Sequence, residues 1–60
     1  MRTASLKVLG EAWAGQVACG LIFHAQWFQV TPLPDDEWEF TVKEENAHFL
    51  EWLRDVSQRH

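Results

Sequence analysis

An abrupt change of hydrophobic spacing near residue 43 constrains the fold more than any other feature of this chain. Residues 37–42 alternate strictly between apolar and polar types, and the apolar positions are Trp38, Phe40 and Val42. A period of two predicts a strand with one face against a core and the other toward solvent. After residue 43 the spacing becomes helical, so a strand is followed closely by a helix.

The segment 44–58 has the spacing of an amphipathic helix. Its apolar stripe consists of Ala47, Phe49, Leu50, Trp52, Leu53 and Val56. Thr41 and Glu44 match a capping box, so we expect the helix to begin beside them. The stripe is expected to pack on the apolar face of the strand, with Trp38 and Trp52 both in the resulting core.

A loop precedes this strand. Residues 31–36 contain two prolines and two aspartates, and Pro34 suits the second position of a type I turn. Pro32 cannot donate a ladder hydrogen bond, so a strand over 21–30 should end near it. This segment and 37–42 together predict an antiparallel hairpin.

The first twenty residues fit two interpretations. Alternation over 3–9 predicts a strand, whereas Leu6, Leu9, Trp13 and Val17 also match a helical stripe. The three glycines at 10, 15 and 20 each cost a helix interior about 1 kcal/mol relative to alanine. We therefore favour two short strands, 3–9 and 11–19, over one N-terminal helix.

Together these elements predict an α+β fold in one small domain, 1–60. It has an antiparallel sheet of about three strands and one C-terminal amphipathic helix packed on one face. A 60-residue chain buries little of its surface, and chains of this size often use disulfides, a metal or a second subunit for stability. Cys19 is the only cysteine, and no zinc-binding spacing is present. We therefore expect a homodimer or a heteromeric complex, with no metal and no cofactor.

Catalytic groups are sparse. Cys19 with His24 or His48 could formally supply a nucleophile and a base, but Cys19 lies between Ala18 and Gly20 in an apolar run. Such a cysteine is typical of an inert, buried filler. The acidic pairs Asp35/Asp36 and Glu44/Glu45 fall at an expected turn and helix start, in expected solvent and without an apolar surround, so we do not expect them to act as general acids or bases. No phosphate-binding glycine pattern is present. The sequence predicts a protein that is not an enzyme.

The charge of the chain argues against nucleic acid as a partner. The net charge is −4, and the five basic residues are spread along the sequence. A groove that follows a phosphate backbone needs clustered lysine and arginine. A nucleic-acid-associated or DNA-mimicking module is the alternative function, although nine acidic residues are modest for a mimic. A small enzyme or enzyme subunit is the third.

Aromatic content favours a protein partner. Four tryptophans and four phenylalanines provide more area than a small core covers, and tryptophan is enriched at interface centres. We expect a small acidic regulator of bacterial or phage type, an adaptor or inhibitor of a larger protein. The expected binding residues are Trp27 as first anchor, Trp13 as second, and Phe28, Asp35 and Asp36.

Targeting signals and membrane spans are not evident. The N-terminal residues lack the apolar core of a signal peptide, and residues 17–28 fall short of the ~20 apolar residues that a membrane span needs. We expect a cytoplasmic protein with no membrane partner.

Overall fold

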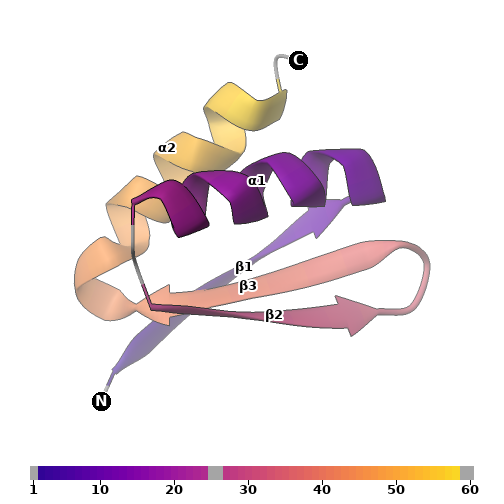
Figure 1. The fold of residues 1–60 in the computed structure, drawn as a ribbon. Helices are drawn as coiled ribbons and strands as arrows, with labels where there is room; N and C mark the ends of the chain where they lie inside the picture. Colours follow the sequence, from indigo (N-terminus) through magenta and orange to yellow (C-terminus); the bar gives the residue numbers. More distant parts are fainter. Residues whose placement is uncertain (1, 25–26, 59–60) are drawn as a thin grey trace.

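The computed structural model describes residues 2–24 and 27–58 and has both helices on one face of a sheet (Figure 1). The elements are β1 (Thr3–Leu9), α1 (Glu11–Phe23), β2 (Phe28–Leu33), β3 (Glu37–Lys43), the 3-10 helix η1 (Glu44–Asn46) and α2 (Ala47–Gln58). The α+β class and the three-stranded antiparallel sheet are as predicted. The helix layer differs from the expectation, because it contains two helices instead of one.

Strand β3 lies in the centre of the sheet, in the order β1-β3-β2, and is antiparallel to both neighbours. β1 and β2 therefore run parallel to each other, and α1 makes the crossover between them in a split β-α-β arrangement. Phe40 in β3 faces Leu6 on one side and Val30 on the other. This topology leaves β1 and β2 as the two edge strands.

The core lies between the helices and the inner face of the sheet. Its buried members are Val8, Ala14, Val17, Leu21, Phe40, Val42, Leu50 and Leu53. The apolar residues of β3 thus face the helices, as their alternation predicts. The outer face of the sheet has no helix over it (Figure 1). Most of its side chains are polar: Ser5 and Thr41 share a hydroxyl hydrogen bond of 2.8 Å, and Lys7 stands opposite Glu39.

Helix α1 replaces the predicted strand over 11–19, because two of the glycines have roles that do not oppose a helix. Gly10 precedes the helix at a φ of 99°, a value that glycine tolerates best, and its N–H donates to Asp36 O at 2.8 Å. Gly20 lies where the two helices meet: a Cβ there would be 2.5 Å from Leu53 Cδ1. Tertiary packing outweighs the low helix propensity of these residues.

The hairpin of β2 and β3 is confirmed, but its first strand starts later than predicted. Residues 21–23 form the last turn of α1, and β2 begins at Phe28. The prediction for residues 25 and 26 falls outside the described residues. In the turn, Asp35 and Asp36 have φ values of 63° and 60°. The turn is therefore not type I. Left-handed residues give hairpin turns a twist that matches the strands.

The predicted capping box is wrong. Thr41 lies within β3, where its hydroxyl bonds to Ser5 instead of a helix N–H. Glu44 begins η1, which has Lys43 as its N-cap and no side-chain cap hydrogen bond, and α2 follows from Ala47. The strand continues through Lys43 because β1 pairs with it along its whole length.

Candidate interaction surfaces

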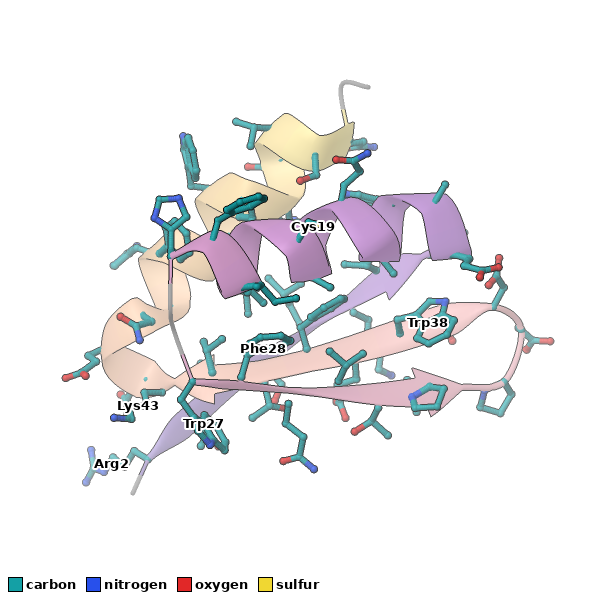
Figure 2. All side chains as sticks on the ribbon, in the orientation of Figure 1. Arg2, Cys19, Trp27, Phe28, Trp38 and Lys43 are labelled. Carbon is teal, nitrogen blue, oxygen red and sulfur yellow. The ribbon has the colours of Figure 1, made fainter. Side chains whose placement is uncertain are left out.

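The five residues expected to bind a partner do not form one surface. Trp27 is 43% exposed and points away from the helices, at the sheet end where Arg2 and Lys43 also lie (Figure 2). Asp35 and Asp36 are exposed at the turn, at the opposite end of the β2–β3 hairpin. The Asp36 carboxylate accepts a hydrogen bond from Trp38 Nε1 at 3.2 Å.

Trp13 and Phe28 are half-buried and pack against the core. The Trp13 indole N–H donates to the backbone carbonyl of Arg54 at 2.9 Å, which links α1 to α2. Phe28 points from β2 toward the helices (Figure 2). The surroundings of both side chains are those of residues that hold elements together.

Helix α1 is apolar on nearly every side, although the protein covers only one. Its thirteen residues include two polar side chains, Glu11 and Gln16. Only Ala14, Val17 and Leu21 are buried. A helix without a polar face is usually surrounded by other structure. Here the last turn instead exposes Ile22 at 64% and Phe23 at 87%.

The neighbouring part of α2 extends this exposed apolar area. The His24 ring, at the end of α1, meets the Phe49 ring edge-on with 4.8 Å between centroids. Phe49 in turn stacks on Trp52 at 5.9 Å. Trp52 was expected in the core, but it is 55% exposed, because Leu50 and Leu53 already fill the space beneath α2.

We call the group Phe23, Phe49 and Trp52, where the end of α1 meets α2, the aromatic surface. Sequence reasoning missed it because residues 11–19 and 21–30 are predicted as strands and Trp52 is predicted in the core. The signal was present, since a run with two polar residues in thirteen has no side suited to water.

Cys19 also lies on the exposed side of α1, which corrects the expectation that it is buried (Figure 2). Val17 and Leu21 point into the core, and a residue midway between them in a helix points the opposite way. In a strand, Val17, Cys19 and Leu21 would all have pointed to the same face.

A second surface is the free edge of β1. Gly10 N–H donates to Asp36 O, and Glu44 N–H donates to Arg2 O at 3.0 Å, so these pairs extend the β1–β3 ladder at both ends. Alternate residues of a strand direct their backbone groups to opposite sides. The even-numbered residues of β1 therefore bond to β3. The odd-numbered ones, Thr3, Ser5, Lys7 and Leu9, direct N–H and C=O toward the free edge.

A groove of about 270 Å³ runs between this edge and α2. Its lining residues are Ala4, Ser5, Leu6, Ala47, Leu50, Glu51 and Arg54. Polar and apolar surface contribute about equally to its lining, and Glu51 and Arg54 add one charge of each sign. A strand added beside β1 would direct its alternate side chains into this groove, as in the addition of peptides to sheet edges.

Two observations describe the polar and metal-ligating groups of the part of the chain that the structure covers. No group of three or more metal-ligating side chains comes together among the described residues. A groove of about 470 Å³ is lined by Leu9, Gly10, Ala12, Trp13, Gln16, Ser57 and Gln58. These residues contribute amides and a hydroxyl but no titratable side chain. Neither α1 nor α2 has the length and hydropathy needed to cross a bilayer.

Comparison with protein-family models, with curated proteins and with solved structures found no match to this chain.

Proposed function

We propose that this chain is a non-catalytic, protein-binding regulator that acts through the aromatic surface. The observation that carries the proposal is α1 itself, a helix that is apolar all round and buried on one side only. Phenylalanine and tryptophan side chains each bury about 150–250 Å² when covered. Phe23 and Trp52 are 87% and 55% exposed, so much of this area is open to a partner, and tryptophan is enriched at interface hot spots.

The charges near this surface favour a partner with an apolar patch of its own. The last turn of α1 has no basic residue, and the only acidic residue of this helix, Glu11, lies in its first turn. On α2, the exposed carboxylates of Glu51 and Asp55 lie close to Trp52 in the sequence. We propose that apolar contact supplies most of the attraction and that these two charges lie at its rim. That property separates the proposal from a DNA-mimicking role, in which carboxylates carry the affinity.

The experiment begins with capture of the partner. A photoreactive benzophenone maleimide attached to Cys19 places the cross-linker beside the aromatic surface. The captured partner is then purified and titrated calorimetrically with the wild-type protein and with two variants. We expect Phe23→Ser to weaken binding by about tenfold or more, which corresponds to about 1.4 kcal/mol. The control, Gln29→Ser on the outer face of the sheet, should leave the affinity within experimental error.

Salt provides the second arm of this experiment. Apolar contact is screened little by ions, so the affinity should change little when ionic strength rises from low to high. A steep loss of affinity with salt, together with an unchanged affinity for Phe23→Ser, would refute the aromatic surface as the binding site. That result would support the DNA-mimicking alternative.

A further inference from the structure

The two edges of the sheet differ in their capacity to accept another strand. Because β3 uses its even-numbered residues for β1, its odd-numbered residues bond to β2. The backbone groups of Phe28, Val30 and Pro32 then point to the free edge of β2, where Pro32 has no N–H to donate. Proline on an edge strand opposes further pairing. The free edge of β1 has no proline and directs four residues outward over its seven-residue length.

We infer that β1 pairs antiparallel with β1 of a second copy of this chain, which joins the two sheets into one. The inference does not rest on the proposed function, since the β1 edge and the aromatic surface are different parts of the molecule. Two features favour a second copy of this chain at the β1 edge: the register of the paired strands and the charges along the adjoining groove.

The register follows from which residues point outward. With the two-fold axis at Leu6, Thr3 faces Leu9 of the second copy and Ser5 faces its Lys7. The four residues whose backbone N–H and C=O groups point to the free edge then all pair with the second copy. Each facing pair exchanges two backbone hydrogen bonds. A shift that places the axis at Lys7 would bring two lysines directly opposite each other, which is destabilising. The centred register avoids this contact and is self-complementary, as a two-fold interface requires.

The groove supplies matching charges. The axis at Leu6 passes beside the groove that α2 lines with Leu50, Glu51 and Arg54. Two copies of α2 would lie antiparallel across this axis, with Glu51 of each near Arg54 of the other. Arg54 now pairs with its neighbour Asp55 at 3.1 Å on the surface. Exposed pairs of this kind contribute little to stability, so Arg54 can exchange partners at small cost.

Sedimentation velocity across a micromolar concentration range tests the inference. The wild-type protein should sediment as a dimer that dissociates on dilution. Lys7→Pro removes an outward N–H from the middle of the edge without touching the β1–β3 ladder, and we expect a dissociation constant about a hundredfold higher. Lys7→Ala keeps the N–H and should dimerise like the wild type. A dimer that survives Lys7→Pro, or a wild-type monomer throughout, overturns the inference.

A charge exchange keeps the inference testable if Lys7→Pro fails to fold. Glu51→Arg and Arg54→Glu each place like charges together across the two-fold axis, so each alone should weaken the dimer about tenfold. The double variant E51R/R54E restores opposite charges and should restore the dimer. Recovery of this kind requires two copies of the same helix. A double variant no better than the single ones would refute the second copy as the occupant.

The same measurements separate this inference from the proposed function. Phe23→Ser should sediment like the wild type, and Lys7→Pro should bind the captured partner with an unchanged affinity per chain.

Discussion

Gly15 and Gly20 lie in the same helix but have opposite surroundings. A Cβ at Gly15 would meet no atom within 4 Å, whereas at Gly20 it would meet Leu53 Cδ1, Cδ2 and Cγ at 2.5, 2.8 and 3.1 Å. Leu53 is buried, so it has little room to move aside. The packing of Leu53 in α2 against α1 therefore depends on the absence of a methyl group at Gly20.

This difference predicts opposite effects of one substitution at two positions. Gly15→Ala should stabilise the protein by about 0.5–1 kcal/mol, because alanine has the higher helix propensity. Gly20→Ala has the same propensity gain but overpacks the helix contact, which typically costs about 1–3 kcal/mol. We expect a net loss of about 1 kcal/mol, or about 4–8 °C in Tm. Thermal melts of both variants measure the two changes in Tm. Equal changes in the same direction would show that the contact with Leu53 does not require glycine at position 20.

The tryptophans provide a second residue-scale prediction. Trp38 packs against the core, whereas Trp27 is 43% exposed and points away from the helices. Trp38→Ala should cost about 2–3 kcal/mol, somewhat below the ~3–5 kcal/mol for a fully buried tryptophan. Trp27→Ala should cost less than about 1 kcal/mol. Chemical denaturation of the two variants compares them directly, and similar losses would place Trp27 in the core.

At the scale of elements, periodicity predicted β3 and most of α2 because each has one apolar and one polar side. Trp38, Phe40 and Val42 alternate, and Leu50 and Leu53 repeat at helical spacing. Helix α1 was not predicted for the opposite reason. Its own residues are apolar on nearly every side, so its sequence has no helical period of apolar and polar positions. The start of α2 was misplaced because Thr41 and Glu44 resemble a cap, while pairing with β1 extends β3 past them.

The β2–β3 turn gives an element-scale prediction. Asp35 has a left-handed φ of 63°, which costs most residues about 1–2 kcal/mol and costs glycine nothing. Asp35→Gly should therefore be at least as stable as the wild type, while Asp35→Ala should be less stable than Asp35→Gly by about 1 kcal/mol. Urea denaturation of the pair measures the difference. An alanine variant as stable as the glycine variant would contradict a left-handed conformation at this position.

At the scale of the whole molecule, the helix layer carries the aromatic surface at one end, and the sheet offers a free edge at β1. The sequence predicted that aromatic area would be in excess, but it pointed to Trp27 and Trp13. It could not identify Phe23 and Trp52, because their exposure depends on how α1 and α2 fill the core. The β1 edge was equally hidden, since strand order is set by tertiary pairing.

The proposed assembly through β1 has a thermodynamic consequence. Because a dimer is stabilised by mass action, Tm should rise with protein concentration in the wild type. Lys7→Pro should melt at a temperature that does not depend on concentration. Calorimetric scans at two concentrations for each protein test this; a wild-type Tm independent of concentration would argue against the dimer.

The central claim is that another protein covers the aromatic surface in the cell, and Cys19 reports on it directly. Its alkylation rate by N-ethylmaleimide is measured in the host cells and for the purified protein. A Gln29→Cys, Cys19→Ser variant provides a reference thiol on the outer face of the sheet. Relative to that reference, we predict Cys19 to react about tenfold more slowly in cells than when purified, and Phe23→Ser to abolish this protection. Equal relative rates in cells and in purified protein would contradict the claim.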